Sequence, residues 1–311
     1  MKNLERDHVY LLVILAIAAF LRIYEFIGLS PPAINIDEYV LSKIFDLIII
    51  GLVYGLTSKV MKSRKAGLFA AALSVGVPLY NWGVAFELYH TLALFLYLLT
   101  LYILVSVNEM EDWWFGLFVP LILAFIHIYG LFLVAALFLF IFFVELERLK
   151  FSKKELYFIG MTSFIAVIIF LSFSITPALL LVIKQYINIG YYTIGSENFT
   201  LIKALSIAGT LPIYIGVIGA YYSIKKRSKY GLIFMGTSGV FLGGMLFNII
   251  PISLGLPYLI LSLAVFSGFV YEKFVRLVGV SRFKKYKTAI LFLLFIVVLL
   301  IESGHWILSS V

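Results

Sequence analysis

Apolar residues recur along this chain in runs of 15 to 20 residues, and short polar or charged segments separate the runs. A helix of this length crosses roughly 30 Å of hydrocarbon. The pattern therefore predicts an all-α, polytopic membrane protein with about eleven transmembrane helices. We expect a single membrane domain over residues 1–311. The predicted spans lie near residues 9–28, 41–58, 66–83, 90–107, 113–127, 129–146, 156–176, 204–224, 231–250, 257–271 and 288–304.

Composition narrows the chemistry open to such a chain. Hydrophobic residues make up 63% of it and charged residues 13%, whereas soluble domains average about half and a quarter. The chain has no cysteine, which excludes a disulfide framework, a thiolate metal site and a thiol nucleophile. It also lacks HExxH, GxSxG and Walker-type motifs, which argues against zinc proteases, serine hydrolases and P-loop pumps.

Basic residues predict the orientation of the spans. With the N-terminus in the cytoplasm, all but four of the 24 Lys and Arg residues fall in inside segments, as the positive-inside rule requires. This topology accounts for the net charge of +8, so no nucleic-acid partner is expected. The first apolar run is expected to be a retained span of a cell-membrane protein rather than a signal peptide. An odd number of spans places the C-terminus outside.

Two adjacent carboxylates, Asp37 and Glu38, follow the first predicted span on the outer side. Pro31 and Pro32 precede them and prevent the first helix from simply continuing. A carboxylate in a partly dry cavity can accept a proton from an attacking hydroxyl, so the pair is a candidate general base. The alternative is a solvated loop whose two acids cap the N-terminus of the next helix.

The four basic residues on or near the outer side are candidates for binding a phosphate group. Arg22 ends the first span, and a guanidinium binds phosphate well. Lys43, Lys184 and Lys203 also depart from the inside pattern. The alternative for Arg22 is a snorkelling side chain paired with Glu25, and interfacial snorkelling is the alternative for the lysines.

Further candidates surround the fourth, fifth and sixth predicted spans. Glu87 and His90 lie three residues apart, on one face of a helix, where they could orient a substrate hydroxyl. His127 and Tyr129 mark a polar bend between two short spans. A Glu/His pair gives too few ligands to assign a metal site, so a divalent metal stays possible and no cofactor is certain. A structural role at a membrane bend is the alternative for His127.

These residues resemble a known family, the GT-C glycosyltransferases, and within it the dolichyl-phosphate-mannose mannosyltransferase-like branch. The resemblance covers roughly residues 10–145. Its most specific parts are the loop that ends in Asp37-Glu38 and the bend His127-Ile128-Tyr129-Gly130. The stretches that carry it are residues 21–39, 51–80, 86–104 and 124–140. Residues 1–150 would then be the GT-C-like catalytic half, and 151–311 a variable transmembrane half.

The resemblance implies a reaction on the outer membrane face. Such enzymes move a sugar from a polyprenyl-phosphate or diphosphate donor to a lipid, glycan or protein hydroxyl, usually with inversion. Asp37 would be the general base, and Glu38 and Glu87 would orient acceptor or sugar. Arg22 and an outer Lys would hold the leaving phosphate, and the residues at the bend would line the cavity.

The chain departs from the family pattern in three places. Its first outer loop has only about a dozen residues, Leu88-Tyr89 follows Glu87 where the family often has Glu-x-Arg, and Leu256-Pro257-Tyr258 stands where the family often has Arg-Tyr. Two alternatives therefore stay open. One is a non-catalytic protein that binds or translocates a lipid-linked sugar. The other is a secondary transporter, for which the deeper carboxylate Asp46 is the main indication.

Overall fold

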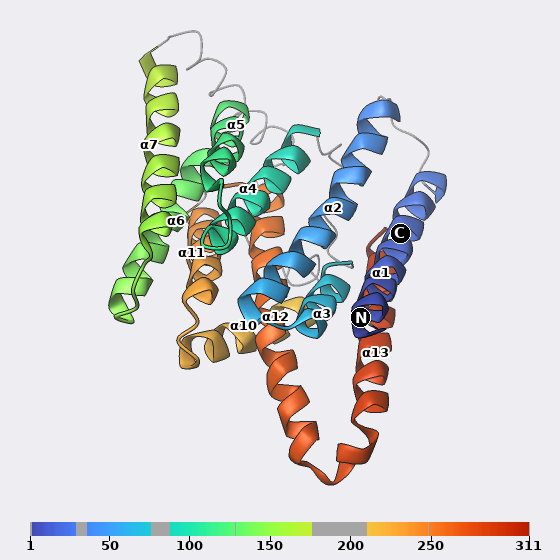
Figure 1. Ribbon diagram of the computed structural model, residues 1–311. Coiled ribbons are helices and arrows are strands. Elements are labelled where there is room, and N and C mark those ends of the chain that lie inside the picture. Colours follow the sequence, from blue (N-terminus) through green and yellow to red (C-terminus); the bar gives the residue numbers. More distant parts are fainter. Residues whose placement is uncertain are drawn as a thin grey trace.

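The computed structural model describes residues 2–28, 36–75, 88–127, 129–175, 210–247 and 249–310, and in this part of the chain all regular structure is helical (Figure 1). The first seven α-helices are α1 (Lys2–Gly28), α2 (Ile36–Met61), α3 (Arg64–Val75), α4 (Leu88–Ser106), α5 (Phe118–Ile126), α6 (Tyr129–Leu146) and α7 (Lys153–Ile175). The others are α10 (Thr210–Lys225), α11 (Lys229–Leu246), α12 (Ile252–Val280) and α13 (Lys287–Ser310). Two 3₁₀ helices, η1 (Trp113–Leu117) and η2 (Arg282–Tyr286), precede α5 and α13.

Each predicted apolar run overlaps one or more of these helices within the described residues. Five of the described helices are long and apolar enough to cross a membrane: α2, α6, α7, α12 and the segment from η2 into α13. The all-helical, membrane-type character predicted from the sequence is therefore confirmed. The count of eleven spans and the GT-C arrangement stay predictions.

Helix α12 is the central element of the bundle. It packs against α2, α3, α10 and α11, and 83% of its apolar window is buried, compared with 17% for the segment that contains α13. Pro257 lies inside α12 rather than at its beginning, and the helix continues to Val280 instead of ending near residue 271. Glu272 pairs with Arg276 one turn later, which supports the helix beyond its apolar part.

Glycines allow α10 to pack closely against α12. A Cβ atom on Gly219 would lie 2.0 Å from the carbonyl oxygen of Phe266, and one on Gly216 would lie 2.7 Å from that of Leu263. Both distances are far below van der Waals contact, so neither position accepts a side chain without moving the helices apart. Small residues are typical of helix contacts in membranes, where packing replaces the hydrophobic effect.

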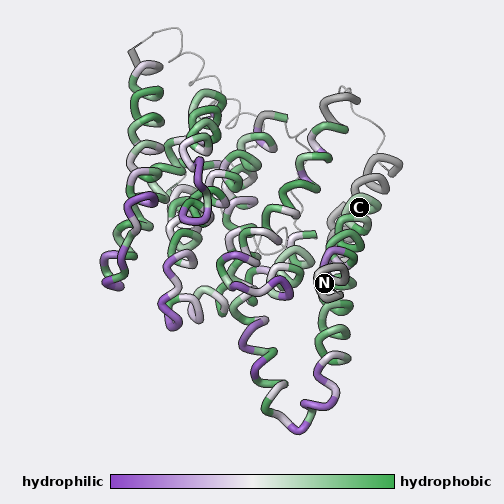
Figure 2. The backbone as a smooth tube through the Cα atoms, viewed as in Figure 1, coloured by the Kyte–Doolittle hydropathy of each residue, from purple (hydrophilic) through white to green (hydrophobic). Residues whose placement is uncertain are grey.

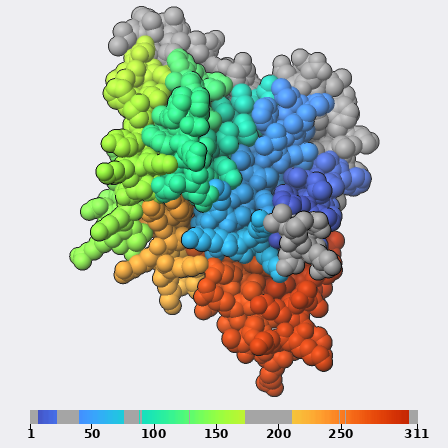
Figure 3. Space-filling model, viewed as in Figure 1, coloured from blue at the N-terminus to red at the C-terminus, as the bar shows by residue number. Residues whose placement is uncertain are grey.

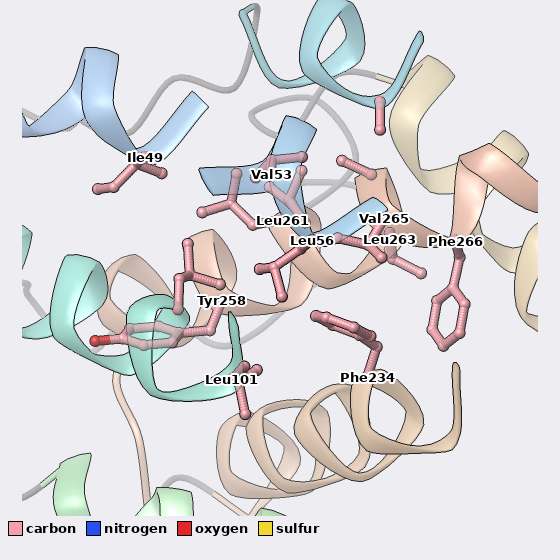
Figure 4. Packing of buried hydrophobic residues seen from close by; sticks show 14 of the residues in the cluster. Ile49, Val53, Leu56, Leu101, Phe234, Tyr258, Leu261, Leu263, Val265 and Phe266 are labelled. Atoms are coloured by element: carbon pink, nitrogen blue, oxygen red, sulfur yellow. The ribbon is translucent and has the colours of Figure 1, made fainter. Parts of the chain in front are cut away.

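The apolar core is centred on the same helix. Figure 4 shows side chains from four helices converging on it. The labelled members are Ile49, Val53 and Leu56 from α2, Leu101 from α4, Phe234 from α11, and Tyr258, Leu261, Leu263, Val265 and Phe266 from α12.

The molecule has two chemically different ends. Figure 2 shows hydrophilic residues gathered mainly at the lower ends of the helices, where the sequence predicts the cytoplasmic side. At this end, the hairpin formed by α12, η2 and α13 projects beyond the rest of the bundle (Figure 3). We call this the inner end, and we call the opposite end, where α2 begins, the outer end.

A hydrogen-bonded network around Glu155 joins three parts of the chain at the inner end. The carboxylate of Glu155, which is 1% exposed, accepts from the Lys229 ammonium at 2.7 Å and from the Tyr230 hydroxyl at 2.7 Å. It also accepts from the backbone N–H of Ser152 at 2.6 Å and from the Asn108 amide at 3.2 Å. The network fixes the start of α7 to the start of α11 and to the segment after α4.

Candidate functional site

Two histidines meet at the outer part of the bundle. His90 lies in the first turn of α4, and His127 lies in the link between α5 and α6. The distance from His127 Nε2 to His90 Nδ1 is 3.1 Å, and the two rings meet edge to face with centroids 5.0 Å apart. Both residues were predicted separately as site candidates, and the fold brings them into direct contact.

Local backbone geometry explains how His127 reaches this position. Helix α5 ends there because His127 is extended, with φ −146° and ψ 142°, and α6 begins two residues later. A Cβ atom on Gly130 would lie 2.8 Å from the Cα of Ala124, so the sharp reversal requires glycine at that position. The predicted bend is therefore a real break between two helices.

Hydrogen bonding assigns the tautomers of the two rings. The backbone N–H of Tyr129 donates to His127 Nδ1 at 3.3 Å, so this nitrogen carries no proton. His127 therefore carries its proton on Nε2 and donates it to His90 Nδ1, which places the proton of His90 on its own Nε2.

Tyr129 extends the histidine pair into an aromatic cluster. Its ring centroid lies 4.1 Å from that of His127 and 5.0 Å from that of Tyr258. Tyr258 stacks on Phe241 at 4.2 Å and meets Tyr97 edge to face at 5.1 Å. We call His90, Tyr97, His127, Tyr129, Phe241 and Tyr258 the outer aromatic cluster; it joins α4, α6, α11, α12 and the α5–α6 link.

The hydroxyl of Tyr129 is the most unusual polar group in the outer aromatic cluster. The residue is 2% exposed, and no described residue forms a hydrogen bond with the hydroxyl. A buried hydroxyl without a hydrogen bond costs about 1–3 kcal/mol. A ligand that reached this hydroxyl would recover that free energy.

Helix α2 connects the outer aromatic cluster to the predicted acidic pair. The Ser42 hydroxyl lies 3.1 Å from that of Thr91, the residue after His90, and the ring of Phe45 contacts Phe95 at 5.2 Å. Asp37 lies in the first turn of α2, five residues before Ser42. At 1.5 Å per residue, its backbone is about 7.5 Å along the helix axis from the contact with α4.

The structure describes only part of the predicted site. Asp37 and Glu38 have described backbones in α2, and Arg22 has one in α1, but their side chains lie outside the described part. Lys43 is half-buried on α2. The remaining candidates, Glu87, Lys184 and Lys203, lie outside the described residues.

Three residues of the outer aromatic cluster were not among the site residues predicted from the sequence, namely Tyr97, Phe241 and Tyr258. All three lie inside apolar runs, where tyrosine and phenylalanine are common, so no local signal distinguishes them. Only the departure Leu256-Pro257-Tyr258 drew attention to one of them. Within the described ranges, no group of three or more His, Asp or Glu side chains is placed to hold a metal ion.

Compared with known proteins, the chain matches no protein-family model, and it matches no curated protein.

Proposed function

We propose that this protein is a GT-C-type membrane glycosyltransferase that moves a sugar from a polyprenyl-phosphate or diphosphate donor to a hydroxyl acceptor on the outer membrane face. One observation carries the proposal. Three candidates that were predicted on separate segments, His90, His127 and Tyr129, form one partly buried cluster. Helix α2, which begins with Asp37 and Glu38, contacts α4 beside that cluster.

In this proposal the acidic pair supplies the proton chemistry. Asp37 accepts the proton of the acceptor hydroxyl as its oxygen bonds to the anomeric carbon, and Glu38 and Glu87 orient the acceptor or sugar. The bond from the anomeric carbon to the donor oxygen breaks, and its electrons leave with the phosphate. Arg22 and an outer lysine, Lys43, Lys184 or Lys203, stabilise the phosphate charge that develops.

The outer aromatic cluster suits the binding part of this role. Both ring nitrogens of His127 already form hydrogen bonds within the protein, so this ring positions its neighbours and leaves phosphate binding to the cations. The Tyr129 hydroxyl can donate to or accept from a sugar hydroxyl, since no described residue occupies it. Its aromatic neighbours provide a rigid, apolar floor for the sugar ring or the first isoprene units.

Sugar transfer by the purified protein tests the proposal. Polyprenyl-phosphate sugars and a membrane-lipid acceptor pool would be supplied to the wild type, to Asp37→Asn and to the control Asp112→Asn. Asp112 lies at the inner end before η1, and its side chain makes no capping hydrogen bond. We expect transfer by the wild type and the control, and loss of transfer but not of donor binding in Asp37→Asn. Full activity of Asp37→Asn would contradict the general-base role.

A second candidate function is favoured by one observation, the burial of Asp46. This carboxylate is 0% exposed within the apolar span Val40–Met61 of α2, whereas the other predicted acids lie near helix ends. A fully buried acid inside a span is typical of substrate or ion pathways in transporters. The protein would then move a lipid-linked sugar or a small solute instead of transferring the sugar.

Reconstitution separates the two candidates. A transporter would move labelled substrate across proteoliposome membranes without changing it chemically, and Asp46→Asn would abolish this movement while Asp37→Asn would not. A glycosyltransferase would yield a new glycosidic product, and Asp37→Asn would abolish its formation.

A further inference from the structure

A cleft of about 330 Å³ opens at the inner end, far from the outer aromatic cluster. Its walls come from the beginnings of α1, α3 and α13 and from the last part of α12. The volume falls within the range of small-molecule sites, and the cleft is partly open. The charged residues of its lining are two lysines, Lys65 and Lys287, and one carboxylate, Asp7.

The lining of this cleft changes from polar to apolar in the same direction on three helices. Helices α1, α3 and α13 all start at the inner end and run towards the outer end (Figure 1). On α3, Lys65 precedes Leu68, and on α1, Asp7 precedes Tyr10. On α13, Lys287 and Thr288 precede three apolar residues, Leu291, Phe292 and Phe295. From Lys287 to Phe295 the gradient extends about 12 Å, at 1.5 Å per residue.

The charges at the polar end of the cleft are available to a ligand. No described residue forms an ion pair with Lys65 or Lys287, whereas Lys59, Lys226 and Lys229 at the same end each contact a glutamate. The Lys287 ammonium lies against the bare backbone of α12, 3.6 Å from where a Cβ atom on Gly279 would be.

We propose that this cleft binds one anionic glycerophospholipid of the inner leaflet. Lys65 and Lys287 would bind its phosphate, Asp7 would accept a hydrogen bond from a hydroxyl of its headgroup, and the acyl chains would lie along Leu291, Phe292 and Phe295. The polar-to-apolar order of the lining matches the order of a phospholipid from headgroup to chains. Basic pockets between helices on the cytoplasmic side bind such headgroups in other membrane proteins. The bound lipid also covers Phe292, which is 52% exposed on α13.

Native mass spectrometry of the purified protein in detergent tests this site without reference to sugar transfer. The probes are dioleoyl phosphatidylglycerol, phosphatidylcholine and phosphatidylethanolamine with the same chains, and water-soluble glycerol phosphate. The variants are Lys65→Gln/Lys287→Gln, the matched control Lys284→Gln/Lys285→Gln, and the charge-preserving Lys65→Arg/Lys287→Arg. Lys284 and Lys285 are exposed in η2 and do not line the cleft.

We expect one tightly bound phosphatidylglycerol in the wild type, the control and the arginine variant. The Lys65→Gln/Lys287→Gln protein should bind it roughly 30-fold more weakly, since each lysine near an anionic headgroup contributes about fivefold. Equal weakening in the control would overturn the proposal, because it would show diffuse surface attraction. Equal affinity for phosphatidylcholine or phosphatidylethanolamine would overturn the selectivity for an anionic lipid. Displacement of the lipid by glycerol phosphate at equal concentration would overturn the role of the acyl chains.

Discussion

The Glu155 network at the inner end and the outer aromatic cluster use buried polar groups in opposite ways. At the inner end, the carboxylate of Glu155 has its charge compensated by Lys229 and its oxygens occupied by Tyr230, Ser152 and Asn108. At the outer end, the histidines are joined by a single hydrogen bond, and no described residue satisfies the Tyr129 hydroxyl. A satisfied network stabilises and fixes a fold, whereas an unsatisfied buried group costs stability unless a ligand completes it. We infer that the inner network is structural and that the outer aromatic cluster is the place where a ligand binds.

The largest effect on stability is expected from Glu155→Gln. The substitution keeps the shape of the side chain but leaves the partly buried Lys229 ammonium without a counter-charge. Breaking a buried ion pair costs about 3 kcal/mol. The melting temperature in detergent should fall by several degrees, while donor binding at a temperature where the protein stays folded should be unchanged. Glu111→Gln, at an exposed site nearby, is the control and should leave the melting temperature unaltered.

A smaller loss of stability but a larger loss of binding is expected from His127→Phe. The ring contact with Tyr129 is kept, but the hydrogen bonds to His90 Nδ1 and from the Tyr129 N–H are lost, which costs about 1 kcal/mol each. His127 then no longer holds the side chains of His90 and Tyr129 in place. The affinity for a lipid-linked sugar should therefore fall roughly tenfold, equivalent to one hydrogen bond of 1.4 kcal/mol. Titration with a fluorescent lipid-linked sugar measures this affinity.

The exposed histidine on α1, His8, offers the matched substitution His8→Phe. Donor affinity should be the same in this protein as in the wild type. A fall of equal size in both variants would mean that neither histidine marks the binding site.

Tyr129→Phe is expected to change stability and donor binding in opposite directions. Removing a buried hydroxyl that no described residue satisfies should raise the free energy of unfolding by up to about 1 kcal/mol. The same change should weaken donor binding, because the ligand loses a hydrogen-bond partner. A structural role alone would show the opposite result, a less stable protein with unchanged affinity. Thermal melting and donor titration on the same preparation distinguish the two.

The smallest effect on stability is expected from Lys59→Gln. The Lys59–Glu109 pair is short, at 2.7 Å, but the two side chains are 26% and 72% exposed. Exposed ion pairs contribute about 0.5 kcal/mol, and salt screens them. The melting temperature should change by about a degree or less, and should not change at all in high salt. A loss as large as that of Glu155→Gln would show that exposure does not decide the strength of these inner pairs.

The apolar runs of the sequence located the helices well because their length and hydrophobicity are local properties. The ends of the helices were harder to place. Helix α12 begins five residues before the predicted start at Pro257 and continues past Glu272, since an i,i+4 ion pair supports a helical turn that the hydrophobic pattern does not reveal. Helix α13 likewise extends to Ser310 instead of ending near residue 304.

The members of the outer aromatic cluster were only partly predictable. A histidine beside a glycine-containing bend is rare in apolar sequence, so His127 and Tyr129 were found as candidates. Their contacts with His90 and Tyr258 depend on how α4 and α12 pack, which no local pattern specifies. Glu155 was missed because Lys153 and Lys154 beside it were interpreted as inside charges, and its partners Lys229 and Tyr230 are more than 70 residues away.

Photo-crosslinking tests the central claim most directly, namely that the ligand binds at the outer aromatic cluster. A polyprenyl-phosphate sugar analogue with a photoreactive group on its first isoprene unit would be bound to the wild-type protein, irradiated, and mapped by peptide mass spectrometry. Labels should fall within residues 36–46, 88–97 and 127–132 and should disappear with excess unlabelled donor. Competable labels confined to the inner end, around Glu155 or the projecting hairpin of α12 and α13, would contradict the account.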